Sequence, residues 1–315
     1  MSSFRRFVTL TVIMTYLVIL AGAVVRGTGS GLGCPDWPRC FGQWVPPTEL
    51  SELPTDYKEV YKIAGKTIAD FDPYKTWTEY LNRLAGALLG FMVLVLFIKA
   101  IGLRHKEKNL AWFCGFLLLL VSVQGGIGAL VVSTHLKPFI ITIHMFLAII
   151  LLFGLIYLKK YCSDLEYIGL VQPAPKTLQR LSKILIAVTL IQTLLGTQVR
   201  QLVDHLMRDL GVATAETVIG QLGVMFYIHR SFSLVLILLN IYLIFKIHRL
   251  AFNRPQFVNG VLSLFCLGAN VFSGVKLNYF DFPANMQPPH LFFAILAIGL
   301  QFSLYLKMKG TLLDD

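Results

Sequence analysis

Apolar residues occur along this chain in eight long runs, separated by shorter polar segments. A helix that crosses a bilayer needs about 20 consecutive, predominantly apolar residues, and the longest runs reach that length. The pattern therefore predicts an all-α polytopic membrane protein with eight transmembrane helices. The predicted spans are 7–25, 84–103, 110–132, 139–158, 184–199, 231–245, 257–275 and 291–306.

The two longest segments between spans carry apolar residues at helical spacing. In 26–83 these residues are Tyr57, Val60, Tyr61 and Ala64. In 200–230 a similar stripe runs from Val199 to Met207. We expect an amphipathic helix in each segment, either on the membrane surface or packed as an ordinary loop helix.

Composition agrees with the spans. Hydrophobic residues make up 56% of the 315 residues and charged residues 14%, whereas a soluble domain carries about 25% charge. This balance excludes intrinsic disorder, a coiled coil, a collagen and a disulfide-stapled miniprotein.

The distribution of charge predicts orientation. With the N-terminus inside, the inner segments carry 16 basic and 5 acidic residues, and the outer segments carry 12 of each. The whole net charge of +11 then lies inside, as the positive-inside rule requires. We therefore expect a bacterial cell membrane location with both termini cytoplasmic, and the basic charge does not indicate nucleic-acid binding.

The two halves of the chain repeat each other. Four spans per half give both halves the same orientation, so the repeat is a parallel one about an axis along the membrane normal. We expect two pseudo-symmetric four-helix bundles, 1–160 and 161–315, each with a pocket near the outer side. The matching segments are 22–26 with 196–200, Asn82-Arg83 with His229-Arg230, and His144 with His290.

Histidines at the outer ends of spans suggest metal chemistry. His229 begins the sixth predicted span and His290 the eighth, so both can point into one bundle core. Two facing histidines in a four-helix bundle can hold a haem iron by both axial positions. Zinc fits less well, because suitable third and fourth ligands are lacking nearby.

The first half departs from this pattern. His144 matches His290, but Asn82 stands where the second half has His229. An iron in the first pocket would have one strong axial ligand and one weak or open position, which suits oxygen chemistry. His135, in the THLKP loop, is the alternative second ligand.

Charged residues cluster around the same positions. Glu79 lies three residues before Asn82 and shares its helix face if the helix begins this early; it could handle protons, or simply favour the helix start. Arginines recur at outer span ends and could contact haem propionates or snorkel to the interface. They are Arg26, Arg83, Arg200 and Arg230.

Two cysteines flank PDWPR in the first outer loop. Cys34 and Cys40 are close enough to form a disulfide on an oxidising outer side, and a redox-active thiol pair is the alternative. The preceding GTGSGLG segment lacks the spacing of a dinucleotide-binding motif.

These segments together resemble the haem A synthases, the CtaA/Cox15 family. The resemblance covers about residues 8–306. The segments that carry it are AGAVVRGTGSGLGCPDWPRCFGQWVPP, EYLNRLAG, THLKPFIITIHMFLA, YIHRS and PPHLFFA.

The resemblance implies oxidation of a methyl group of haem O to the formyl group of haem A, for terminal oxidase assembly. It implies a haem b between His229 and His290, a substrate pocket with Glu79 and His144, and the Cys34–Cys40 pair. The family's other first-pocket histidine is Asn82 here, which puts bis-histidine ligation of the substrate haem in doubt. Haem O synthase, the protohaem farnesyltransferase, and an electron donor are expected partners.

Two other classes share some of these features. A non-catalytic di-haem electron carrier or anchor subunit would use the same bundles and histidines, but would favour two symmetric bis-histidine sites. A repeat transporter would show helices broken by Gly or Pro near the midplane, and no span shows this convincingly.

Overall fold

The computed structural model confirms eight membrane-length helices. It describes residues 1–105, 107–167, 172–210, 215–250 and 254–312, and these residues form helices and no strand. All eight long helices are apolar enough to cross a membrane, so the chain is a multi-pass membrane protein. They are α1 (Ser2–Gly27), α3 (Pro73–Gly102), α4 (Lys108–Ser133), α5 (Pro138–Glu166), α6 (Lys176–Leu210), α8 (Gly223–Arg249), α9 (Arg254–Tyr279) and α10 (Gln287–Lys309).

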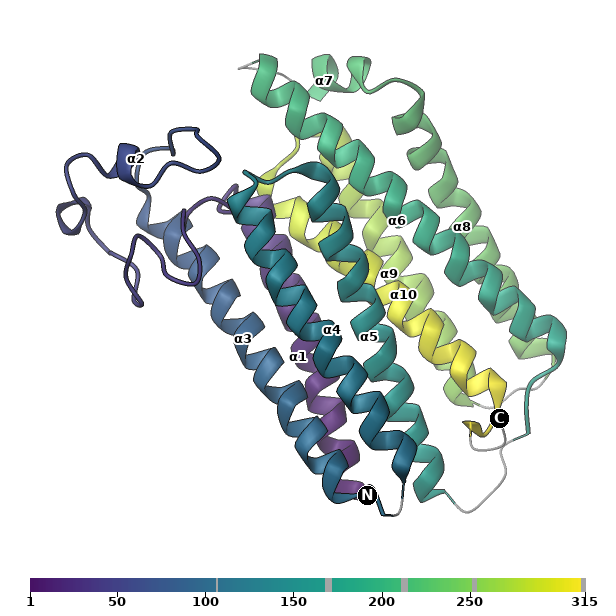
Figure 1. Cartoon of the computed structure of the whole chain (residues 1–315). Coiled ribbons are helices and arrows are strands. Elements are labelled where there is room, and N and C mark those ends of the chain that lie inside the picture. The colour runs from purple at the N-terminus through teal and green to yellow at the C-terminus, as the bar shows by residue number, and fades with distance from the viewer. Residues whose placement is uncertain (106, 168–171, 211–214, 251–253, 313–315) are drawn as a thin grey trace. The chain divides into compact units, whose positions relative to one another are not determined.

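The chain divides into two compact units, 6–155 and 1–5 with 156–315. In the first unit, α3 packs along α4, and the outer loop before α3 holds η1 (Leu50–Glu52) and α2 (Tyr57–Val60). Figure 1 shows this loop beyond the N-terminal end of α3. The predicted division into one bundle at 1–160 and another at 161–315 stays a prediction.

Four helices of the second unit share one apolar core. Helix α6 packs against α8 and α10, and α9 packs against the same two helices. Leucines such as Leu185, Leu243 and Leu304 are buried where these helices meet. The short helices α7 (Ala215–Gln221) and η2 (Ala284–Met286) lie in the connections.

Helix α3 begins eleven residues before its predicted span. Asp72 caps it, since its side chain accepts hydrogen bonds from the backbone N–H groups of Tyr74 and Lys75, and Pro73 occupies a first-turn position that suits proline. This early start places Glu79, Asn82 and Arg83 on a helix.

The amphipathic helix expected around residues 57–64 is only partly present. Helix α2 is four residues long and ends before Tyr61, which has φ −106° and ψ 38°. Ala64 and Gly65 further along adopt positive φ, which a right-handed helix excludes. Tyr57 is nevertheless buried in the core of the loop, whereas Val60 is exposed.

The second amphipathic stripe belongs to a longer helix. Helix α6 continues past Val199 to Leu210, and Val203 packs with Val218, Leu222 and Phe226 of the following segment. This finding favours the packed-helix interpretation over a helix lying on the membrane surface.

The turn between the third and fourth long helices is the same in both halves. His135 and Leu136 have φ of 56° and 59°, and Asp281 and Phe282 have φ of 55° and 51°. Each pair is 146 residues from its counterpart, so the repeat extends to the backbone conformation of this turn. Two successive left-handed residues are uncommon outside glycine, which makes the correspondence specific.

Candidate haem-binding site

The four positions singled out by the repeat each face a glycine. A β-carbon placed on that glycine would lie 3.8 Å from Oδ1 of Asn82, 3.3 Å from Cε1 of His144, 2.9 Å from Cε1 of His229 and 3.0 Å from Cε1 of His290. These glycines come from the neighbouring helix and make room for the side chain. They are Gly22 on α1, Gly128 on α4, Gly196 on α6 and Gly274 on α9.

His229 and His290 face each other in the second half. Their ring centroids are 6.4 Å apart and the rings are inclined by 74°. Two imidazoles on opposite sides of one metal, with metal–nitrogen bonds of about 2.0 Å, have centroids roughly 6 Å apart. The pair therefore has the spacing that axial ligation of one iron requires.

Hydrogen bonds fix the orientation of His290. Its Nδ1 lies 2.9 Å from the backbone carbonyl of Asn270 and 3.1 Å from the Ser273 hydroxyl. A proton on Nδ1 that is donated to the carbonyl leaves the Nε2 lone pair free for a metal. Asn270 in turn donates from its side-chain amide to the backbone carbonyl of His290.

The other two histidines are held in a related way. Gln192 donates to the backbone carbonyl of His229 at 2.8 Å, and Gln124 donates to that of His144 at 2.9 Å. The Nδ1 atoms of both histidines are buried without a hydrogen-bond partner in the described part of the chain.

The first half keeps the geometry but changes the chemistry. Oδ1 of Asn82 is buried without a partner among the described residues. The position that matches Gln192, 174 residues earlier, is Val18. Position 82 therefore lacks both the imidazole of His229 and the glutamine amide that binds the His229 backbone. Position 144 has both an imidazole and such an amide, from Gln124.

Glu79 and Arg83 form a buried ion pair beside this position. Nη2 of Arg83 is 2.5 Å from Oε1 of Glu79, and the side chains are 13% and 4% exposed. The other carboxylate oxygen of Glu79 accepts a hydrogen bond from the backbone N–H of Cys34 at 3.0 Å. Glu79 therefore binds the outer loop directly.

The predicted disulfide between Cys34 and Cys40 is present. Both cysteines are fully buried, and Phe41 beside them packs against Tyr57, Tyr61 and Phe71. Cys114, Cys162 and Cys266 are buried.

The other predicted arginines have local partners. Arg200 pairs with Asp204 at 2.7 Å, and Arg230 lies over the rings of Phe226 and Tyr227. Arg26 is in the last turn of α1. Contact of these arginines with propionates stays a prediction, as does His135 as an alternative ligand.

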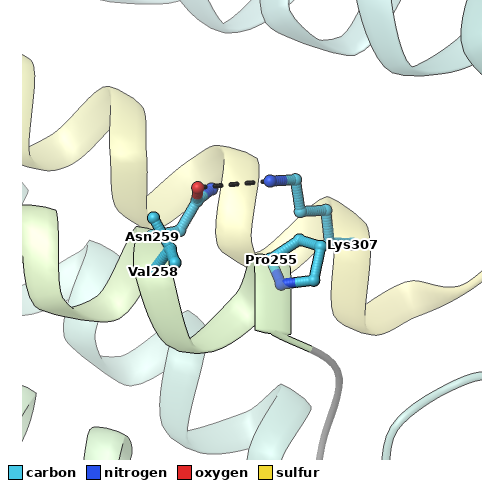
Figure 2. A pocket seen from close by; sticks show the side chains of 4 residues that line it. All are labelled: Pro255, Val258, Asn259 and Lys307. Carbon is cyan, nitrogen blue, oxygen red and sulfur yellow. Dashed lines mark hydrogen bonds between the residues drawn. The ribbon is translucent and has the colours of Figure 1, made fainter.

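A shallow cavity lies at the other end of the second unit. It has a volume of about 330 Å³ and is lined by Pro255, Val258, Asn259 and Lys307. Figure 2 shows Lys307 directed at Asn259, to which it donates a hydrogen bond. His290 is seventeen residues away on the same helix, about 25 Å along its axis, so this cavity is separate from the histidines.

The donor set suits a haem better than a bare metal ion. In the described part of the chain no group of three or more His, Cys, Asp or Glu side chains could hold a metal ion. Two imidazoles without further ligands match a metal whose equatorial ligands come from a porphyrin. The residues present therefore fit a haem in the second half.

Sequence reasoning missed the residues that support the histidines. Gly22 and Gly196 were matched by the repeat, but Gly128, Gly274 and the amides of Gln124, Gln192 and Asn270 lie inside apolar runs and were not singled out. The repeat offsets hold the signal, because Gly128 matches Gly274 and Gln124 matches Asn270 at 146 residues.

Comparison with known proteins agrees with the earlier resemblance. The family model COX15-CtaA, described as cytochrome oxidase assembly protein, matches residues 5–302. A protein named heme A synthase from Shewanella oneidensis is 34% identical over 154 residues, which is 48% of this chain and 43% of that protein.

Two further relatives carry the same name. The protein from Geobacillus kaustophilus is 33% identical over 47% of this chain and 40% of its own length. The protein from Hyphomonas neptunium is 26% identical over 62% of this chain and 58% of its own length. The chain thus spans about half the length of the curated relatives it matches.

Proposed function

Because the chain belongs to the COX15-CtaA family of cytochrome oxidase assembly proteins, we propose that it is a haem A synthase. In this proposal it is a membrane oxidoreductase that oxidises one methyl group of haem O to the formyl group of haem A, for terminal oxidase assembly. The observation that carries the proposal is the repeated glycine-facing position, filled by histidine three times and by asparagine once.

The second half serves electron transfer in this proposal. His229 and His290 would hold a haem b by both axial positions, and a haem iron ligated in this way supplies one-electron transfer. Asn270 and Ser273 keep the His290 imidazole in one tautomer. Gly196 and Gly274 leave room for the two rings.

The first half binds the substrate. His144 would hold the iron of haem O from one side, with its backbone fixed by Gln124. Asn82, a poor iron ligand, leaves the opposite side open for reaction. Glu79 is one turn of helix before Asn82 and handles protons, since it is the buried carboxylate next to that position.

The overall change replaces two hydrogens of the methyl group by one oxygen. With dioxygen as the oxidant, each of two successive hydroxylations consumes one O2, two electrons from the donor and two protons, and releases one water. Together they convert the methyl to an aldehyde hydrate, which loses water to leave the formyl group. A buried carboxylate suits the accompanying proton transfers, because it is positioned and shielded from bulk water.

The proposed location is the cell membrane, with both termini in the cytoplasm. The excess of basic residues on the N-terminal side supports this orientation. The long outer loop and the haem positions then face the outer half of the membrane. Haem O would arrive through the lipid from haem O synthase, and a separate donor would supply electrons.

The test is a pigment analysis. The chain is expressed in a host that makes haem O but no haem A, and extracted haems are separated by chromatography and identified by mass. We expect haem A with the wild type, and haem b without haem A in His144→Ala. The control His248→Ala changes a histidine that lies beside Phe257, and it should retain haem A.

The alternative function predicts a different result. A di-haem electron carrier would bind haem without converting haem O, even with oxygen present. Haem b alone in the wild-type extract would therefore refute the synthase and favour the carrier. Haem A that persists in His144→Ala would refute the assignment of the substrate ligand.

A further inference from the structure

Four side chains on one stripe of α3 bind the outer loop. Thr76 donates to the carbonyl of Gly33 at 2.9 Å, and Tyr80 donates to the carbonyl of Trp44. Glu79 and Arg83 complete the set, at the i, i+3, i+4, i+7 spacing of one helix face. The loop that carries the disulfide is therefore docked on the first turns of α3.

Every N–H of the Arg83 guanidinium has an acceptor. Nε and one N–H of Nη2 go to Oε1 of Glu79, and the other N–H of Nη2 goes to the carbonyl of Cys34 at 2.8 Å. Nη1 donates to the carbonyls of Asp36 at 2.6 Å and Arg39 at 3.0 Å. A propionate contact by Arg83 would have to replace one of these five bonds.

The second half lacks this arrangement. Arg230 corresponds to Arg83, but the residue that corresponds to Glu79 is Phe226. Arg230 lies over the rings of Phe226 and Tyr227 instead of pairing with a carboxylate. The ion pair is thus confined to the half that the proposed function assigns to the substrate.

The attraction within a buried ion pair offsets the cost of desolvating both charges only when the remaining donors and acceptors of the pair are also hydrogen-bonded. Here all five donors of Arg83 are satisfied, and Glu79 also accepts from Cys34. Removing Arg83 would leave a buried carboxylate with only the neutral backbone donors of Cys34 and Gly33. It would also leave three loop carbonyls without their hydrogen bonds from Arg83. Loss of the Arg83 hydrogen bonds would therefore destabilise both the Glu79 carboxylate and the docked loop.

We propose that Arg83 is a positioning residue, which holds the Glu79 carboxylate and the Cys34–Cys40 loop in one arrangement. This inference rests on the proposed function for its link to catalysis, but the docking of the loop can be tested without it. Arg83 acts through Glu79 and the loop backbone and makes no contact with the substrate.

The experiment uses the full chain with Arg83→Gln, Arg83→Lys and the matched control Arg230→Gln. The first readout is the rate at which a membrane-impermeant phosphine reduces the disulfide, followed by maleimide labelling and mass. In Arg83→Gln we expect this rate to rise at least about tenfold, because breaking a buried pair is strongly destabilising. In Arg230→Gln we expect the wild-type rate.

The second readout is haem A formed per haem b bound, measured in the same variants with and without Glu79→Gln. Arg83→Gln should lower this ratio at least about tenfold while haem b is retained, and the double variant should be no lower than Glu79→Gln alone. Arg83→Lys should recover part of the ratio, since an ammonium restores the ion pair with Glu79 but not the planar set of five guanidinium donors.

Each contrary result overturns a stated part of the proposal. An unchanged reduction rate in Arg83→Gln would show that Arg83 does not hold the loop. Additive losses with Glu79→Gln would show that Arg83 acts elsewhere, for example on a propionate. If the wild type forms no haem A, the proposed function fails, and the reduction rate still decides whether Arg83 holds the loop.

Discussion

Asn82 and His229 occupy the same place in the two halves, each opposite a glycine of the preceding long helix of its own half. The asparagine lacks the ring and leaves its Oδ1 buried and unpaired among the described residues. This single difference separates a position that can ligate iron strongly from one that cannot.

Replacing Asn82 with histidine should give the first half a pair of facing histidines like the pair in the second half. In Asn82→His we expect haem in the first half to become low-spin, because an imidazole fills the open side of the iron. Haem A formed per protein should not be abolished, since the resemblance to the family places a histidine at this position. Paramagnetic resonance and haem analysis measure the two effects.

Asn82→Gln is the control for the change at position 82. It keeps an amide of similar polarity and should not add a low-spin signal. If Asn82→His shows an unchanged spectrum, residue 82 does not face the iron.

The glycine opposite His290 should control binding of haem b. In Gly274→Ala the new β-carbon would lie 3.0 Å from Cε1 of His290, so the ring must move. Overpacking of this kind costs about 1–3 kcal/mol, which lowers haem b affinity roughly fivefold or more. The reduced-minus-oxidised absorbance per protein reports the occupancy.

Gly268→Ala is the matched control on the same helix. No atom lies within 4 Å of its added β-carbon, so haem b should stay at the wild-type level. Equal occupancy in the two variants would argue against His290 as a ligand.

Gly33 should be essential for docking of the outer loop. A β-carbon at this position would lie 2.5 Å from the backbone carbonyl oxygen of Lys75, and backbone cannot move aside cheaply. Gly33→Ala should therefore speed reduction of the Cys34–Cys40 disulfide by a membrane-impermeant phosphine. A destabilisation of about 1–3 kcal/mol corresponds to a rise of roughly fivefold or more.

Gly31→Ala provides the comparison for Gly33→Ala. Its β-carbon would make an ordinary contact of 3.4 Å with the Leu136 side chain, so the reduction rate should stay near that of the wild type. A Gly33→Ala loop that resists reduction as well as the wild type does would contradict the docking.

The ion pair between Lys58 and Asp70 in the outer loop should not make the loop sensitive to pH near neutrality. The Lys58 hydrogen bond and charge hold the pKa of Asp70 below its ordinary 3.8. A carboxylate with a depressed pKa contributes stability above its unfolded pKa and loses it as pH falls through the folded pKa. Disulfide reduction, corrected for the intrinsic pH dependence of the reagent, should therefore be constant between roughly pH 5 and 8.

Asp70→Asn tests the same ion pair by mutation. Because both side chains are exposed, removing the charge should leave the reduction rate and the haem A yield unchanged. A large effect would mean that the pair orders the loop.

Much of the fold follows from sequence because a bilayer imposes length and apolarity on each span. The helix bounds were underestimated where polar residues continue a helix. At the end of α6, for example, Arg200 and Asp204 form an i, i+4 pair that supports three further turns. In the outer loop, the helical spacing at 57–64 predicted a longer helix than the structure has, because the backbone leaves the helical conformation at Tyr61.

The candidate site was predictable in part. The three histidines and Asn82 follow from the repeat, and the disulfide from two nearby cysteines. Contact of Arg83 with a propionate stays a prediction, whereas its bonds to three loop carbonyls could not be predicted, because a sequence shows the charge of Arg83 but not the carbonyls that the loop presents to it. Every residue type has a backbone carbonyl, so hydrogen bonds to these acceptors cannot be predicted from the residue types alone.

The way in which the outer loop is docked determines which of its positions tolerate substitution. Within the loop, Arg83 and Thr76 bind only main-chain carbonyl oxygens, and every residue type supplies those. Trp37 and Arg39 are exposed, so their side chains can be exchanged without loss of the main-chain bonds that fasten the loop. The tip of the loop is thus open to mutation, while its attachment depends on a few helix residues, the glycine at position 33 and the two cysteines.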